Sequence, residues 1–292
     1  MLFVALAGLS GLVWGIGDFA GGKATQRADA LGVVWLSKLA SLPLLALYLV
    51  LLPTPVDVGS LWWGVLAGVF GAVGVVVFYR ALSAGAMTVV APIASVTSAV
   101  IPVVVGLATG ERPGALALVG VTCALVAIAL VSLAPPHPGV VSVVTSRLVG
   151  AAVVSGVGFA LFFVFLARAN VAAGGDAGLW PIASAQLGAL VLTGALLLAA
   201  RPGTRSAPAG RRWPRGRTLA WTSVAGPFDM TANALFLVAT RYGDLSLVAP
   251  LAALYPVTTV LLALAVDGER LRPLQVVGLV LALGALLLVS GP

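Results

Sequence analysis

The feature that most constrains this chain is a segment that occurs twice. Residues 78–132 align without a gap on residues 236–290 when they are shifted by 158 positions. At this one offset the Val-Ala-Pro that ends at Pro92 recurs at Pro250, and a Gly-Glu-Arg recurs as well. Apolar runs match by chance because they use few residue types, whereas a proline and a charged tripeptide at a common offset rarely do. We infer an internal duplication, which limits the fold to two related halves.

The composition places both halves in a membrane. Hydrophobic residues make up 61% of the 292 residues and charged residues only 9%, whereas soluble domains carry about 25% charged residues. A soluble protein of this length could not cover its surface with so few charges. The net charge of +7 is explained by basic loops on the cytoplasmic side of a membrane. We therefore expect a lipid bilayer, not nucleic acid, as the partner of these charges.

Ten apolar runs are long enough to cross a bilayer, for which a helix needs about 20 residues. Their continuous content of leucine, valine and alanine is typical of helices, since strands of a membrane barrel alternate apolar and polar residues. The sequence therefore predicts an all-α polytopic membrane protein with ten transmembrane helices. The predicted spans are residues 2–20, 31–52, 61–84, 88–109, 114–133, 148–169, 179–200, 219–241, 245–266 and 274–290.

A connection with three prolines at residues 134–147 divides the chain. We predict it to be a linker between a first five-helix repeat at 1–133 and a second at 148–292. Because five is an odd number of spans, the second repeat must enter the membrane from the opposite side. The repeats are then inverted about an axis in the membrane plane, a plan common among secondary transporters. One chain supplies both halves, so a monomer suffices, and the sequence equally allows an oligomer.

Lysine and arginine residues gather on one side of the predicted fold. The connections that follow odd-numbered spans hold most of them, including six arginines within residues 201–217. The positive-inside rule makes this side cytoplasmic, which predicts that both termini lie outside.

The sequence lacks the residues that common membrane enzymes require. The lone histidine, His137, lies in the linker, and the lone cysteine, Cys123, lies in an apolar run. Residues 8–11 fit the Gly-x-Ser-Gly of rhomboid-type proteases, but that chemistry needs a histidine base beside the serine. Neither a zinc-protease motif nor a phosphate-binding loop occurs. We therefore expect no enzyme, no cofactor and no metal site, and a gradient as the energy source.

Two ionisable residues lie inside the first two predicted spans, where each charge costs a few kcal/mol. Asp18 comes late in the first span, and Lys38 lies about equally far past the short connection. At similar depth the two side chains are candidates for an ion pair that holds this hairpin together. The alternative is that Asp18 or Lys38 faces a water-filled cavity and contacts substrate.

A further acidic residue, Asp229, lies near the centre of the eighth span. Asn233 follows four residues later and shares its helix face, and Pro227 removes a backbone hydrogen bond just before it. Carboxyl groups at membrane depth serve in substrate sites and proton relays. We predict that Asp229 is a substrate or proton site. The structural alternatives are a bond to a backbone group freed near Pro227 or an ion pair with Lys38.

The duplicated fourth and ninth spans carry Pro92 and Pro250, each followed by a second proline. Ser95 and Tyr255 are among the polar residues that come next. Proline frees backbone carbonyl groups, which membrane helices tolerate beside a water-lined cavity. Interrupted helices at corresponding positions of two halves indicate a transport site. The alternative is a pair of kinks that only shape the packing.

Two five-helix repeats, each ending in a proline-bearing span, a Gly-Glu-Arg and a glycine-containing span, resemble the EamA-type ten-helix members of the drug/metabolite transporter superfamily. Trp14 and Gly15 are similar to the opening motif of that family. One departure is that residues 53–60 carry no lysine or arginine, whereas many members have a basic loop there. The resemblance covers nearly the whole chain. It implies a multi-pass carrier of the plasma membrane, which we expect to be bacterial, that exports or exchanges amino acids or other small metabolites, commonly against protons.

The resemblance also implies a central cavity lined by spans one, three, four, six, eight and nine. Asp229 and Asp18 are then the candidates for proton coupling. A non-transporting membrane subunit, a channel and an intramembrane enzyme are the alternative functions. The implied cavity positions are Trp14, Asp18, Pro92, Ser95, Phe159, Asp229, Asn233, Pro250 and Tyr255.

Overall fold

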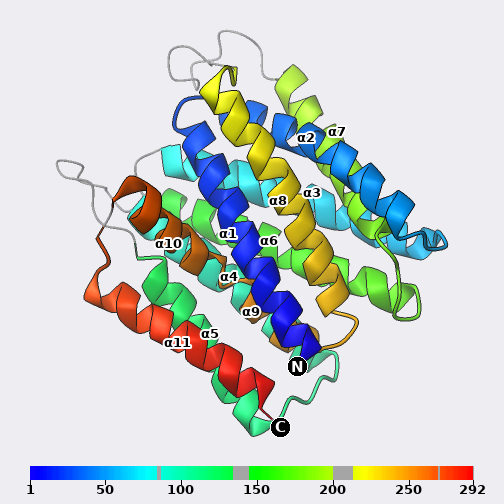
Figure 1. Cartoon of the computed structure of the whole chain (residues 1–292), viewed down its shortest axis with the longest axis vertical. Coiled ribbons are helices and arrows are strands. Elements are labelled where there is room, and N and C mark those ends of the chain that lie inside the picture. Colours follow the sequence, from blue (N-terminus) through cyan, green and yellow to red (C-terminus); the bar gives the residue numbers. More distant parts are fainter. Residues whose placement is uncertain (84–86, 134–144, 200–212, 269, 292) are drawn as a thin grey trace.

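The computed structural model describes residues 1–83, 87–133, 145–199, 213–268 and 270–291. His137, most of the linker and the arginines between 201 and 212 lie outside these residues. The regular elements within the described ranges are all helices (Figure 1). They are α1 (Leu2–Thr25), α2 (Ala30–Leu51), α3 (Val58–Ser83), α4 (Met87–Ala108), α5 (Ala115–Val131), α6 (Ser146–Ala172), α7 (Trp180–Ala199), α8 (Arg217–Ala239), α9 (Leu245–Ala252), α10 (Tyr255–Asp267) and α11 (Pro273–Ser290).

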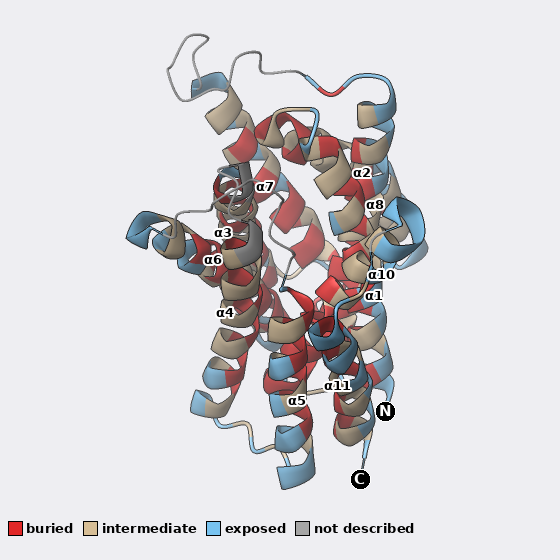
Figure 2. Ribbon diagram, turned by 90° about the vertical axis from the view of Figure 1, so that its left-hand side faces the viewer, coloured by how far each residue is buried: buried red, intermediate tan, exposed pale blue. Residues whose placement is uncertain are grey.

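Most of these helices are long and apolar enough to cross a membrane. Eight candidate spans meet both conditions when α9 and α10 are counted as one. The helix α5 is shorter, at 17 residues, and α8 is less apolar because it carries Asp229 and Asn233. Leu283 and Leu287 on α11 are 64% and 73% exposed, and Figure 2 shows exposed residues along the outside of the helix bundle. The predicted all-α polytopic fold is confirmed.

The ninth span is broken, whereas the sequence predicted one continuous helix over residues 245–266. The helix α9 ends at Ala252, and α10 begins at Tyr255. Pro256 explains the break, because it has no N–H to donate to the carbonyl of Ala252 and disfavours helical geometry in the residue before it. The duplicate of Pro256 in the first half is Ser98, and α4 runs through that position without interruption. Only one of the two duplicated spans is therefore divided.

The helices pack in pairs that a two-fold relation between the halves would produce. The helix α3 packs against α6, and its counterpart α8 packs against α1. In the same way α3 contacts α7 while α8 contacts α2, and α5 pairs with α11. Both termini lie at the same end of the bundle (Figures 1 and 2), as an even number of spans requires.

Glycines at the repeat offset allow the closest approaches between helices. A Cβ atom on Gly68 of α3 would overlap the backbone carbonyl of Ala185 on α7. Its duplicate, Gly226 of α8, would overlap the carbonyl of Ser37 on α2 in the same manner. Small residues of this kind let membrane helices approach backbone to backbone. The duplication therefore extends to α3 and α8, beyond the segment in which the sequence match is clearest.

Candidate functional site

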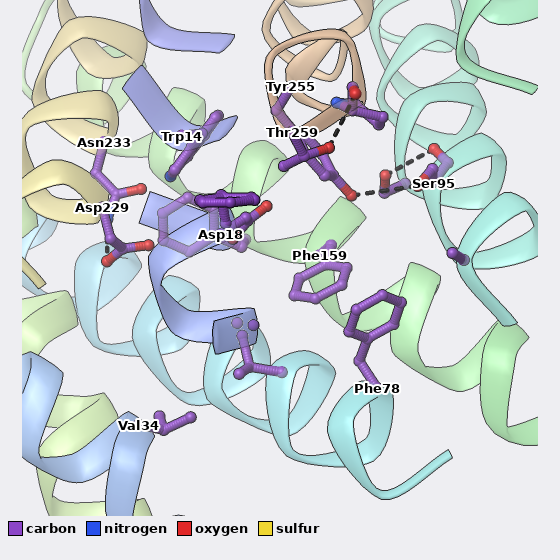
Figure 3. Close-up of a pocket in the computed structure, with 18 of the residues that line it drawn as sticks. Trp14, Asp18, Val34, Phe78, Ser95, Phe159, Asp229, Asn233, Tyr255 and Thr259 are labelled. Carbon is purple, nitrogen blue, oxygen red and sulfur yellow. Dashed lines mark hydrogen bonds between the residues drawn. The ribbon is translucent and has the colours of Figure 1, made fainter. Parts of the chain in front are cut away.

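A cavity of about 440 Å³ lies between the two halves of the molecule. Residues of α1 to α4 line it from the first half, and residues of α6, α7, α8 and α10 line it from the second. Figure 3 shows how side chains from these separate helices converge on the cavity. Near its centre the polar and charged lining residues are Asp18, Lys38, Ser95, Ser98, Gln186, Asp229, Asn233, Tyr255 and Thr259.

The cavity opens at the end of the bundle opposite the termini. Its lining reaches Lys23 and Gln26 at the end of α1 and Asp267 at the end of α10. Lys23 Nζ lies 2.5 Å from Asp267 Oδ1, and these side chains are 24% and 27% exposed. We call Lys23, Gln26 and Asp267 the mouth. It lies on the side where the sequence placed most basic residues, which is the predicted cytoplasmic side.

An aromatic cluster forms the floor of the cavity on the side of the termini. The ring of Trp14 on α1 lies 5.2 Å from that of Phe163 and 6.0 Å from that of Phe236, measured between centroids. Phe163 and Phe236 are 4.8 Å apart, and Phe162 packs beside them. Trp14, Phe162 and Phe163 line the cavity, whereas Phe236 is fully buried beneath them. This floor, made by α1, α6 and α8, separates the cavity from the terminal end.

Polar contacts between the ends of helices close the same side. Asn170 of α6 donates to the carbonyl of Leu237 at 2.7 Å and to Thr240 Oγ1 at 2.8 Å. Arg241, just after α8, pairs with Asp176 at 2.7 Å. The terminal end is therefore held shut by groups from elements that are distant in the sequence.

Glu111 joins the two halves at the closed end. Its carboxylate accepts hydrogen bonds from the backbone N–H groups of Leu245 at 2.9 Å and Ser246 at 2.8 Å. It thereby caps the first turn of α9 in place of Asp244, whose side chain makes no capping bond. Burial and the nearby Glu111 carboxylate raise the pKa of Asp244 above its usual value of 3.8. The duplicate of Glu111, Glu269, lies outside the described residues.

Asp244→Asn is expected to reduce the loss of stability as pH rises above about 4. Because the pKa of Asp244 is raised by folding, the folded protein holds this proton more tightly than the unfolded chain does. The stability it provides is complete below the unfolded value of 3.8 and is lost as pH rises through the folded value. Thermal unfolding of the two proteins should give a Tm difference, variant minus wild type, that increases with pH. A difference that stays constant with pH would contradict this.

The charged centre of the cavity is an ion pair between α2 and α8. Lys38 Nζ lies 2.5 Å from Asp229 Oδ2, with Asp229 the more exposed of the two side chains. Asn233 Nδ2 donates to the same carboxylate oxygen at 3.2 Å, in agreement with the predicted shared helix face. The ion pair suggested between Asp18 and Lys38 is not the one that forms. The reason is that α2, which carries Lys38, packs against α8, which carries Asp229, far more than against α1.

Asp18 is left without a hydrogen bond or salt bridge to any residue that the structure describes. It lines the cavity between the mouth and the aromatic floor. Protein surrounds Asp18 on all sides, yet its side chain is accessible to solvent, because its accessible surface faces the cavity. Lys38 and Asp229 are close enough to act on Asp18 electrostatically. Asp18 is therefore a carboxyl group facing the cavity with its acceptor positions open.

Two further features of the wall concern hydrogen bonding. Asn233 Oδ1 is buried and accepts no hydrogen bond from the described protein atoms. On the opposite side, Ser95 Oγ and Tyr255 Oη lie 3.3 Å apart, so a hydroxyl of α4 meets one of α10 (Figure 3). The cavity thus has a pair of hydroxyls on one wall, and beside the Lys38–Asp229 pair lies an amide oxygen that is buried without a donor.

The structure brings most of the predicted site residues together. Trp14, Asp18, Ser95, Phe159, Asp229, Asn233 and Tyr255 line the cavity. Pro92 and Pro250 do not line it; both lie inside helices, and Pro250 is buried.

Several lining residues had not been predicted from the sequence. Gln186 of α7 is buried and donates to Ser41 at 2.6 Å, and Ser132 and Gln275 line the cavity from the ends of α5 and α11. A buried glutamine in an apolar span is a usable signal, since membrane helices rarely carry one without a partner. Within the described residues no group of histidine, cysteine or acidic side chains is arranged to hold a metal ion.

Comparisons with known proteins agree with this architecture. The EamA-like transporter family profile matches residues 1–133 and 149–291. No curated protein matches the chain. The crystal structure of another protein superposes with a TM-score of 0.75 at 15% sequence identity, over 98% of this chain and 96% of that one. At this identity the similarity shows a shared fold alone. Because the family profile covers both halves and nearly every residue, the chain belongs to the EamA-like transporter family.

Proposed function

We propose that this protein is a secondary transporter that exports or exchanges amino acids or other small metabolites across the plasma membrane by alternating access. The observation that carries the proposal is a cavity between the two halves that is open at one end and closed at the other. Its volume of about 440 Å³ lies in the range of pockets that enclose small molecules. Family membership supports a transporter over a structural subunit or an enzyme.

The mechanism follows from the paired packing of the helices. In the present state α1, α6 and α8 meet at the aromatic floor, whereas the cavity is open to water at the mouth. In the alternate state the residues of the floor separate and the mouth closes. Each repeat then makes the helix contacts that the other repeat makes in the present state. Rocking of inverted repeats about a fixed central site accomplishes this exchange. With the mouth on the cytoplasmic side, the present state loads substrate for export.

Proton coupling is the second part of the proposal. Asp229 and Asp18 are the carboxyl groups at the centre of the cavity, and Lys38 contacts the first of them. A proton that binds Asp229 weakens the ion pair between Asp229 and Lys38. Protonation of Asp229 therefore changes how strongly α2 is held against α8. Substrate and proton then compete for, or share, the same charged centre.

Transport into proteoliposomes that contain a pH-sensitive dye tests the function. A panel of amino acids and small amines is added on one side, and the internal pH and the uptake of labelled compound are recorded together. A substrate-triggered pH change that empty liposomes do not show supports a proton-coupled carrier. Uptake without a pH change retains the carrier and removes the coupling. Neither signal from any panel member opposes transport of these compounds.

Fixing α1 to α10 at the mouth is expected to stop transport reversibly. With Cys123 replaced by serine, Lys23→Cys and Asp267→Cys place one thiol on α1 and one on α10, where the wild-type side chains are in contact. A short bifunctional thiol reagent that can be cleaved by reductant should abolish uptake, and reductant should restore it. Each single-cysteine variant, treated identically, is the matched control. Full uptake by the cross-linked protein would show that transport needs no movement between α1 and α10.

A further inference from the structure

We propose that the cavity selects a small organic cation with an apolar body, such as an aryl or branched alkyl amine, and that Asp18 holds its ammonium group. This inference rests on the proposed transport function and narrows its substrate class. Three observations carry it: the balance of charges, the aromatic wall and the absence of an unpaired basic group along the described lining.

The charges that line the cavity leave one acidic group uncompensated. Lys38 is paired with Asp229, and Lys23 is paired with Asp267 at the mouth. The one remaining charged residue of the described lining is Asp18, and it has neither a salt bridge nor a hydrogen bond there. An unpaired carboxylate in a largely enclosed site is stabilised by a cation. A monovalent cation from outside the protein fits this position.

Aromatic rings supply the apolar part of the site. Figure 3 shows Asp18 between Trp14 and Phe159, and Phe162 and Phe163 complete this side of the lining. The face of an aromatic ring attracts a cation electrostatically, and its area buries an apolar substituent. A compact inorganic cation would leave these rings without a partner. The wall therefore favours an amine with a body about the size of a phenylethyl group.

The pairing of charges along the lining also disfavours a substrate that carries a carboxylate. An anion or zwitterion would need a basic partner, and both lysines of the described lining are already paired. Taking Lys38 for this purpose would leave Asp229 unpaired beside Asp18. The hydroxyls of Ser95 and Tyr255 can donate, but they carry no charge. The expected order of affinity is cation, then zwitterion, then anion.

Three ligands with one common body separate these cases. Phenethylamine, phenylalanine and hydrocinnamate are cation, zwitterion and anion around the same phenylethyl group. Isothermal titration calorimetry on the full-length protein in detergent should show phenethylamine binding at least about tenfold more tightly than the other two. Equal affinities, tighter binding of phenylalanine or hydrocinnamate, or no binding of phenethylamine would overturn the inference.

Variants assign the selectivity to Asp18. Asp18→Asn should lower phenethylamine affinity at least about tenfold. Asp18→Glu keeps the charge and should retain the preference, which guards against a fold defect in Asp18→Asn. Asp57→Asn is the matched control, because Asp57 caps α3 at Ser60 away from the cavity. Wild-type affinity in Asp18→Asn would overturn the assignment.

Uptake of the same three ligands keeps the two proposals distinguishable. If purified protein binds phenethylamine while proteoliposomes move no ligand, the binding site stands and the transport function fails. If phenylalanine or hydrocinnamate is moved in preference to the amine, transport stands and cation selection fails.

Discussion

Asp229→Asn is expected to reduce proton-coupled uptake to the level of empty liposomes. The substitution removes a titratable group at the centre of the cavity, and it leaves the ammonium group of Lys38 without its partner at 2.5 Å. Removing one member of a buried ion pair costs on the order of 3–5 kcal/mol. The cost here should be smaller because Asp229 is partly exposed to the cavity. Uptake of labelled substrate and the internal pH are measured in parallel.

A double substitution separates coupling from structure. Lys38→Gln combined with Asp229→Asn removes both charges and leaves two amides that can still bond. If the pair only holds α2 against α8, the double variant should recover uptake that either single variant loses. If Asp229 carries the proton, the double variant should fold as well as wild type yet show no pH change. Full coupling in Asp229→Asn would remove this residue from the mechanism.

Gly226→Ala is expected to be strongly destabilising, although it adds only one methyl group. The new Cβ would overlap the backbone carbonyl of Ser37, which cannot rotate away as a side chain would. Overpacking usually costs about 1–3 kcal/mol, and contact with a rigid backbone places this case at or above the upper limit. We expect a loss of monodisperse protein and a large decrease in Tm. Gly68→Ala should behave in the same way, because it meets the carbonyl of Ala185.

Gly284→Ala is the matched control for that result. Gly284 lies within α11, and a Cβ there would have no atom within 4 Å. Alanine is a better helix former than glycine by about 1 kcal/mol, so this variant should be as stable as wild type or slightly more so. Equal stability of Gly226→Ala and Gly284→Ala would show that α8 and α2 are less closely packed than described.

Much of the fold could be predicted because the duplication and the apolar runs are both explicit in the sequence. A single offset linked Pro92 to Pro250, and the same offset relates Gly68 to Gly226, which the structure shows in equivalent contacts. The shared face of Asp229 and Asn233 followed from helical geometry alone. These predictions depend on local periodicity, which does not require knowledge of how the helices pack.

What could not be predicted depends on packing between distant helices. Lys38 had two acidic candidates at similar depth, and sequence spacing favoured Asp18 in the adjacent helix over Asp229, 191 residues away. The packing of α1, α2 and α8 decided the outcome. The break before Tyr255 was missed for another reason: Pro102 sits within an unbroken α4, so a proline alone does not show whether its helix will divide.

The division of the ninth span has a thermodynamic consequence for the resting protein. Two identical inverted halves would relate the states open to either side by a two-fold rotation, with equal energies and equal populations. Here one half is continuous through Ser98 and the other is interrupted before Pro256, so that degeneracy is lifted. Each 1.4 kcal/mol of difference changes the ratio of populations about tenfold. In the absence of any gradient, the protein should therefore spend more of its time facing one compartment than the other.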